Sequence, residues 1–350
     1  MYYLQNLKKT GGSLSVISRY RSAIFGISIL GILLFHFSND VLNWRRHDVV
    51  YKLAEFYYNL FGSIGVEIFL FLSGVGLYFS LSKNPDVKSF YERRLRRVLI
   101  PYLLWGVFYW FIRDVLVTRK GVAGFFYDLT MLSFWCEGKR SVWFIALLII
   151  LYAAFPLLFR AMNWEVKRKE RAGFFCLALC VGWIAICSFL SIVTPVFYHN
   201  IEVAFSRVPI FIIGTWYGKR IKNNENFRTV DGIFTVFGFL LITLHMMSEY
   251  SLFGVDLKIH NRFLACVFSI SLLFILCGIL SLLHSDKIGK ALALAGSYSL
   301  ELYICHVGIR GLLMVCDICT HRFVVFAGYI LLSVFFSVVL HQVNKKIQSS

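Results

Sequence analysis

The sequence predicts an all-α membrane protein of about ten transmembrane helices, with both termini in the cytoplasm. Hydrophobic residues make up 58% of the 350 positions, and the mean hydropathy is +0.70. A soluble core of this length does not hide so many apolar side chains. The apolar residues also recur in runs near the 20 or so residues that a bilayer requires. Composition and run length together therefore favour a polytopic bundle.

Ten apolar runs approach the length of a membrane helix. The sixth is the weakest, because it is short and contains Arg207 and Pro209, which neighbouring helices would have to shelter. No soluble domain, linker or low-complexity segment separates the runs, so residues 1–350 are predicted to form a single integral-membrane domain. The runs cover approximately residues 22–40, 61–81, 97–117, 142–160, 173–194, 204–219, 229–248, 262–283, 292–314 and 323–343.

Basic residues predict the orientation of these helices. The formal net charge is +17, yet Lys and Arg form short clusters between apolar runs and no single basic face, which argues against nucleic acid as a partner. With the N-terminus inside, the inner segments hold 23 of the 36 basic residues. This is the asymmetry expected of cytoplasmic loops that contact anionic lipids.

The first run, RSAIFGISILGILLFHFSND, ends in polar side chains. Fifteen residues separate Arg21 from His36, or about 22 Å of helix, so Arg21 is expected at the inner face and His36 near the outer one. An ionisable group at that depth marks a candidate functional site. The alternative is a helix-end histidine bonded to a lipid headgroup or a carbonyl, and this segment alone favours neither.

The second run contains GVEIFLFLSGVGLYF, in which Glu67 lies within an apolar helix. An unpaired carboxylate is costly there and needs a partner. We expect His36 to be that partner, because the two residues lie at similar depth on adjacent helices. A histidine held by a carboxylate suits a general base, although a structural hydrogen bond between helices explains the pair equally well.

The third run is preceded by SFYERRLRRVLIPY, with four arginines at its inner mouth. Guanidinium groups suit phosphates because they donate paired hydrogen bonds. The competing interpretation is an orientation signal that contacts anionic lipid. The cluster is denser than orientation requires. It comprises Arg93, Arg94, Arg96 and Arg97.

Four segments, taken in order along the chain, resemble the membrane acyltransferase 3 family. They are the first helix ending in LLFHF, the GVEIFLFLSG helix, the RRLRRVLIPY segment and a late SYSLELYICHVGI helix; RVPIFIIGTWYG is a weaker match. The resemblance runs from about residue 19 to residue 310. The matching residues are His36; Glu67, Ser73 and Gly74; Phe90, Arg94, Arg97 and Pro101; Ser299, Leu300, Tyr303 and His306; and Arg207, Pro209, Phe211 and Gly214.

The resemblance implies transfer of an acyl group, usually acetyl, to a hydroxyl of a sugar, glycan or lipid-linked saccharide at the bacterial cytoplasmic membrane. The donor would be cytoplasmic acyl-CoA, a substrate and not a bound cofactor, and the arginine cluster would bind its phosphates. His36, oriented by Glu67, would act as the base. Ser73 and Ser297 would donate hydrogen bonds to the thioester oxygen.

The resemblance raises three further candidate residues. The family commonly has an arginine where this chain has Phe25, and Arg21 is the nearest residue that would replace it. His306 is either a packing histidine or a second catalytic group. Arg207 is a further candidate for catalysis or substrate binding.

The competing function is a secondary transporter or a flippase for a glycan or lipid-linked saccharide. Such proteins often show matching halves with broken helices at corresponding positions, and this sequence shows no convincing match of that kind. No Walker loop or GxGxxG is present. Cys316, Cys319 and His321 are poorly spaced for zinc, so a disulfide or separate thiols suit them better.

Overall fold

The computed structural model describes residues 13–43, 48–61, 64–163, 169–247, 258–283, 286–318 and 323–349. All regular elements in these ranges are helices, which confirms the all-α prediction. Cys319 and His321 lie outside the described residues. The helices are α2 (Ser15–Arg19), α3 (Arg21–Leu42), α4 (Val49–Phe61), α5 (Ile64–Lys83), α6 (Val87–Trp110), the π-helix η1 (Phe111–Val117), α7 (Gly121–Leu129), α8 (Leu132–Glu137), α9 (Trp143–Asn163), α10 (Lys169–Val193), α11 (Pro195–Phe205), α12 (Val208–Lys222), α13 (Thr229–Met247), α14 (Lys258–Leu282), α15 (Asp286–Ser297), α16 (Ser299–Val315) and α17 (Phe323–Ser349).

Eight helical stretches in the described chain are long and apolar enough to cross a membrane. A ninth arises if α15 and α16, which meet at an angle of 61°, count as one bent span. The seventh predicted run falls on α13, whose part with described side chains, Thr229–Leu240, is a shorter apolar helix. The protein is thus an integral membrane protein, and its described residues hold eight or nine candidate spans where the sequence predicts about ten.

The sixth run forms part of a longer stretch than predicted. The stretch Pro195–Lys222 consists of α11 and α12, which meet at Ser206 and Arg207. Pro209 lies in the first turn of α12, where its missing N–H costs no helical hydrogen bond. Pro209, which weakened the prediction of the sixth run as a membrane helix, is therefore accommodated in the first turn of α12.

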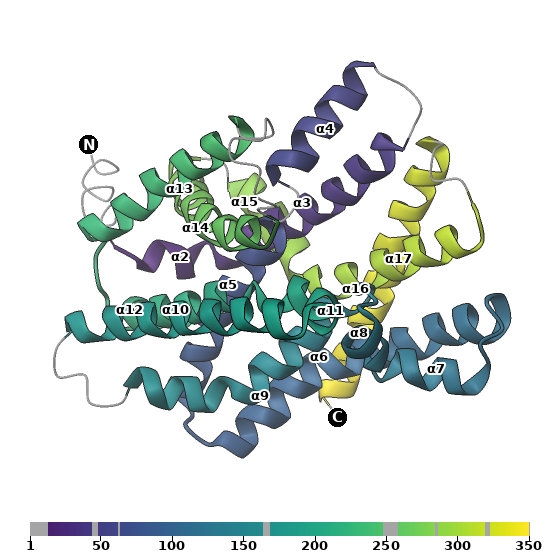
Figure 1. The fold of residues 1–350 in the computed structure, drawn as a ribbon, viewed down its shortest axis with the longest axis horizontal. Helices are drawn as coiled ribbons and strands as arrows, with labels where there is room; N and C mark the ends of the chain where they lie inside the picture. The colour runs from purple at the N-terminus through teal and green to yellow at the C-terminus, as the bar shows by residue number, and fades with distance from the viewer. Residues whose placement is uncertain are drawn as a thin grey trace.

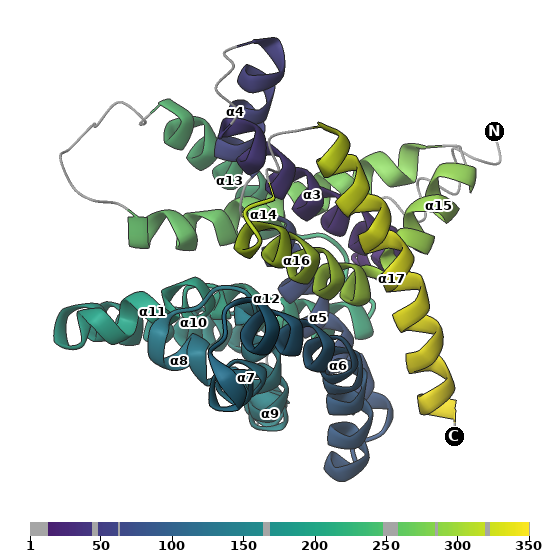
Figure 2. The same ribbon diagram turned by 90° about the vertical axis from the view of Figure 1, so that its right-hand side faces the viewer.

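Helix α5 lies near the centre of the bundle. In Figure 2, α3, α15, α16 and α17 lie to one side of it and α9, α10, α11 and α12 to the other. It packs closely against α12, behind which part of it lies in Figure 1. Glycines permit this approach: a Cβ on Gly214 would lie 2.2 Å from the Phe71 oxygen, and one on Gly74 would lie 2.5 Å from the Phe211 oxygen. Small residues commonly allow such contact between membrane helices.

A second close contact joins α3 to α15. A Cβ on Gly26 would lie 1.9 Å from the Leu292 oxygen, and one on Gly296 would lie 2.0 Å from the Ser22 oxygen. The bend after Ser297 then redirects the chain into α16, which continues beside α3. Because of this bend, α3 and α16 lie beside each other, and their side chains face each other across the contact.

Candidate active site

A pocket with a cavity volume of about 80 Å³ opens among α3, α5, α6, α9 and the α15–α16 bend. Three arginines line it, Arg21 from α3 and Arg94 and Arg97 from α6. The guanidinium of Arg21 packs on Gly76, where a Cβ would lie only 2.1 Å from Nη2. The structure thus brings Arg21 to the arginines from which it is separated by about 75 positions in the chain. The remaining lining residues are Phe25, Phe69, Ser73, Leu77, Val98, Phe144, Leu148, Tyr152, Gly296, Ser299, Leu300 and Tyr303.

The arginine cluster divides between two faces of α6. Arg94 and Arg97 are three residues apart and share the face that lines the pocket. Arg93 and Arg96 are exposed and do not line it. Of the four arginines expected to bind acyl-CoA, two therefore line the pocket and two do not.

A side-chain cap fixes the start of the arginine-bearing helix α6. The carboxylate of Asp86 accepts hydrogen bonds from the backbone N–H groups of Lys88 and Ser89 and from the Ser89 hydroxyl. The Ser89 hydroxyl and amide lower the pKa of Asp86 below its ordinary value. A cap of this kind satisfies N–H groups that the first helical turn leaves without partners.

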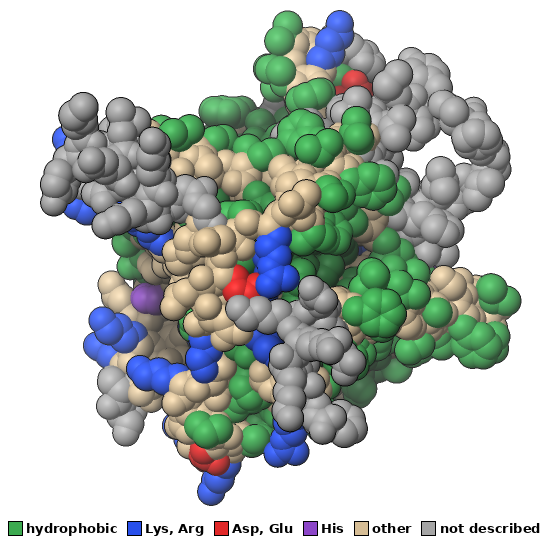
Figure 3. Space-filling view, turned by 90° about the vertical axis from the view of Figure 1, so that its left-hand side faces the viewer, with side chains coloured by type: hydrophobic (Ala, Val, Ile, Leu, Met, Phe, Trp, Pro, Cys, Tyr) green, Lys and Arg blue, Asp and Glu red, His purple; other side chains and the backbone are tan. Residues whose placement is uncertain are grey.

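A second pocket, with a cavity volume of about 410 Å³, shares Arg97, Ser299 and Leu300 with the first. Its wall includes Ser297, so this serine is separated from Ser73, which lines only the first pocket. Glu301 accepts a hydrogen bond from His341 Nδ1 at 3.0 Å on this wall. The other lining residues are Asn344, Lys345 and Gln348. Figure 3 shows one face of the molecule where Lys and Arg side chains gather around a hollow.

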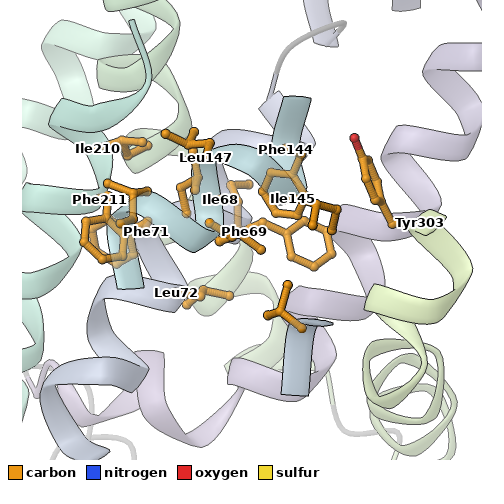
Figure 4. Close-up of a cluster of buried hydrophobic side chains, with 14 of the residues drawn as sticks. Ile68, Phe69, Phe71, Leu72, Phe144, Ile145, Leu147, Ile210, Phe211 and Tyr303 are labelled. Carbon is orange, nitrogen blue, oxygen red and sulfur yellow. The ribbon is translucent and has the colours of Figure 1, made fainter. Parts of the chain in front are cut away.

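Aromatic rings form the inner end of the arginine pocket. The rings of Phe25 and Phe69 lie 5.1 Å apart, and Phe69 continues to Phe144 at 6.1 Å. Phe144 contacts Tyr303 at 5.0 Å, as Figure 4 shows. Tyr303 in turn lies 5.7 Å from the ring of His306, one helical turn further along α16. The pocket lining ends at Tyr303 and includes neither His306 nor His36.

His36 and His306 face each other across α3 and α16. Their ring centroids are 5.2 Å apart. His306 is fully buried, and its Nδ1 lies 2.9 Å from the Leu302 carbonyl. Because a carbonyl only accepts, Nδ1 carries the hydrogen and Nε2 presents a lone pair. Within the described residues, neither His306 Nε2 nor His36 Nδ1 has a hydrogen-bond partner.

A buried ion pair lies one turn beyond the two histidines. Asp40, 3% exposed, follows His36 by four residues, and Arg310 follows His306 by four. Arg310 donates to Asp40 through Nη2 at 2.5 Å and through Nε at 3.1 Å. Sequence analysis missed this pair, although the shared spacing of four residues was a usable signal.

Glu67 contacts Arg207 and not His36, which corrects the expected catalytic pair. Arg207 Nε lies 2.7 Å from Glu67 Oε1, and the two side chains are 5% and 0% exposed. Arg207 also donates to the Val203 carbonyl at 2.6 Å and lies over the ring of Trp143 at 4.9 Å. Glu67 and Arg207 therefore form a buried ion pair that joins α5 to the start of α12.

The fold and this site define an integral-membrane helical protein with a cationic pocket that leads toward paired histidines. The chain matches the acyltransferase 3 family model, an acyltransferase domain, over residues 26–342. The chain therefore belongs to the acyltransferase 3 family and is a membrane acyltransferase. No curated protein and no solved structure matches it. Membership confirms the resemblance inferred from the four segments.

Proposed function

We propose that this protein is an O-acyltransferase that moves an acyl group, usually acetyl, from cytoplasmic acyl-CoA to a hydroxyl of a sugar, glycan or lipid-linked saccharide in the bacterial cytoplasmic membrane. The observation that carries the proposal is the pocket that begins at Arg94 and Arg97 and ends at Tyr303, in ring contact with His306. Family membership favours acyl transfer over the alternative of a transporter or flippase.

The two pockets that share Arg97 suit the two parts of acyl-CoA. The larger pocket, with Lys345 and His341 on its wall, has the polar lining that a nucleotide requires. Arg21, Arg94 and Arg97 would neutralise the phosphates. The narrower aromatic end would hold the pantetheine arm and direct the thioester toward Tyr303. A donor placed in this way would need no acyl-enzyme relay to cover the distance.

The paired histidines supply the proton chemistry in this proposal. The acceptor hydroxyl attacks the thioester carbonyl carbon, a C–O bond forms, and His36 takes the hydroxyl proton. The C–S bond then breaks, and the leaving CoA thiolate receives that proton from the imidazolium. The Nδ1 of His306 donates to the Leu302 carbonyl, so its Nε2 presents a lone pair beside His36. This lone pair would accept a hydrogen bond from the protonated ring of His36. Ser73 lies in the pocket where it would donate to the thioester oxygen.

The test compares two double variants that remove equal charge from one helix. Arg94→Gln with Arg97→Gln removes two charge-assisted contacts, each worth about 1.5–3 kcal/mol, less for the exposed Arg97. The KM for acetyl-CoA should rise at least about tenfold. Arg93→Gln with Arg96→Gln should leave the KM near the wild-type value.

The assay measures transfer of labelled acetyl to a glycan fraction in membrane vesicles, with protein insertion checked by protease accessibility. The matched pair separates donor binding from membrane orientation, because both variants lose two positive charges from the same loop. An equal rise in KM for both pairs, or no rise for either, would place the donor site elsewhere.

A further inference from the structure

The larger of the two pockets, with a cavity volume of about 410 Å³, has charges of both signs on its wall. Arg97 and Lys345 contribute cationic groups, and Glu301 contributes a carboxylate although this residue is only 4% exposed. Phosphate groups suit the two cations, but a carboxylate repels them. A ligand that fits the whole wall must therefore carry both anionic groups and a hydrogen-bond donor.

A network of hydrogen bonds fixes the Glu301 carboxylate. His341 Nδ1 donates to Glu301 Oε1 at 3.0 Å, and Asn344 Nδ2 donates to the same oxygen at 3.4 Å. Gln348 in turn donates to Asn344 Oδ1 at 2.8 Å. Within the described residues, both side-chain bonds to the carboxylate end on Oε1. The lone pairs of Oε2 are therefore available to a donor group on a ligand.

The ring of His341 provides a flat surface on the same wall. The hydrogen bond to Glu301 and the ring of Tyr298, whose centroid is 4.5 Å away, hold this imidazole in place. Nucleobases stack on aromatic side chains, including histidine. A base stacked on His341 would have its edge within reach of the neighbouring carboxylate.

We infer that Glu301 binds the exocyclic amino group of adenine and so selects acyl donors that carry an adenine nucleotide. This assignment rests on the proposed use of acyl-CoA and adds a residue that determines donor specificity. The amino group of adenine donates hydrogen bonds, whereas hypoxanthine has a carbonyl oxygen at that position, which a carboxylate repels. A buried site built to bind an N–H group rejects an analogue without it, because the acceptor of the site is then left unpaired.

The arrangement of the pockets agrees with the order of the parts in acyl-CoA. The larger pocket shares Arg97 with the arginine pocket, whose lining ends at Tyr303. Phosphates at Arg97 would lie between a base at Glu301 and a pantetheine arm that points toward Tyr303. The cavity volume also falls within the range of small-molecule sites, about 300–1,000 Å³.

The experiment uses the full chain in lipid nanodiscs and measures displacement of labelled acetyl-CoA. Adenosine diphosphate and inosine diphosphate carry the same phosphates and ribose, and they differ at the edge of the base that Glu301 would contact. We expect adenosine diphosphate to displace acetyl-CoA at a concentration at least about tenfold lower, as for one charge-assisted hydrogen bond. Equal displacement by the two nucleotides would overturn the recognition of adenine.

A matched pair of variants tests the carboxylate. Glu301→Gln keeps the shape of the side chain and adds an amide donor, which can bind the carbonyl oxygen of inosine. The preference for adenosine diphosphate should therefore fall to about twofold or less. Glu92→Gln makes the same change on an exposed side chain of α6 that lines neither pocket, and this variant should keep the wild-type preference. A wild-type preference in Glu301→Gln would overturn the assignment.

Direct binding of the two labelled nucleotides separates this inference from the proposed function. Equal binding of both nucleotides, together with normal acetyl transfer, would overturn adenine recognition and keep the proposed function. Selective binding of adenosine diphosphate by a protein that neither binds acetyl-CoA nor transfers acetyl would support the adenine site and contradict the proposed function.

Discussion

The buried pair Glu67–Arg207 yields a quantitative prediction. Removing one partner of a buried ion pair leaves an uncompensated charge and costs about 3–5 kcal/mol. Arg207→Met strands Glu67, which is 0% exposed, and should fall in that range. Glu67→Gln should cost less, because Arg207 keeps the Val203 carbonyl and the Trp143 ring. The double variant removes both charges, so the losses should not add, with a coupling energy of about 2–3 kcal/mol.

The assay is equilibrium unfolding of the purified protein in mixed micelles of dodecyl sulfate and a mild detergent. Arg140→Gln provides the control, because Arg140 reaches Glu202 at 3.2 Å but is 53% exposed. An exposed pair should be worth no more than about 1 kcal/mol. Additive losses, or an Arg207→Met cost no larger than that of Arg140→Gln, would refute the reasoning.

The same variants distinguish the observed pair from the one expected from sequence. If Glu67 oriented His36, Glu67→Gln would shift the pH dependence of acyl transfer, because the charge next to the base would change. With Arg207 as the partner, the pH dependence should remain that of the wild type while stability falls. A shifted profile would place Glu67 in contact with the catalytic histidine during turnover.

Three further predictions follow from single contacts. His36→Ala should abolish O-acylation with normal expression, and His306→Gln should reduce it at least about tenfold, as for loss of a general base; wild-type activity in either would remove that histidine from the reaction. Asp40→Asn should lower kcat more than it raises the KM for acetyl-CoA, since Asp40 lies beyond the histidines and outside the donor pockets; the reverse pattern would contradict a positioning role. Gly214→Leu should reduce the yield of folded protein, measured by size-exclusion chromatography. Gly278→Leu should not, because among the described residues no atom lies within 4 Å of a Cβ at that position. Equal yields of the two variants would contradict the close α5–α12 contact.

Hydropathy predicted where helices occur but not where they bend or break. The junction of α15 and α16 at Tyr298 lies inside the apolar run 292–314, whose hydropathy gives no sign of a 61° bend, although Gly296 and Ser297 form a pair that commonly accompanies a helix kink. At this bend, Gly296 of α15 approaches the Ser22 carbonyl of α3 closely. Tertiary contacts of this kind leave no hydropathy signal.

Depth alone could not select the partner of Glu67. His36 was expected at a depth similar to that of Glu67, but a buried carboxylate accepts a hydrogen bond from an arginine as well as from a histidine. A finer signal was present in the sequence. Glu67 precedes Gly74 by seven residues, and Arg207 precedes Gly214 by seven. On two parallel helices, seven residues make about two turns, so the charges meet wherever the glycines meet.

At about 100° per residue, Arg21 lies about 60° and Phe25 about 20° around α3 from His36, and both residues line the arginine pocket. The angle does not keep Arg21 out of the pocket, because its side chain is long and Gly76 leaves space for the guanidinium. Phe25 contributes the first ring of the aromatic wall, in contact with Phe69. Whether Arg21 reaches the pocket therefore depends less on its angle around α3 than on the space that Gly76 leaves for its side chain.

The spacing of four residues from His36 to Asp40 and from His306 to Arg310 has a mechanical consequence. Residues four apart lie on one helix face, so the ion pair and the two rings occupy successive turns of one α3–α16 contact. Sliding α16 by one turn would separate Arg310 from Asp40 and leave a buried carboxylate alone, which is strongly unfavourable. The pair thus fixes the register in which the imidazole rings face each other. In this way a contact outside both donor pockets sets the geometry of the proposed proton transfer.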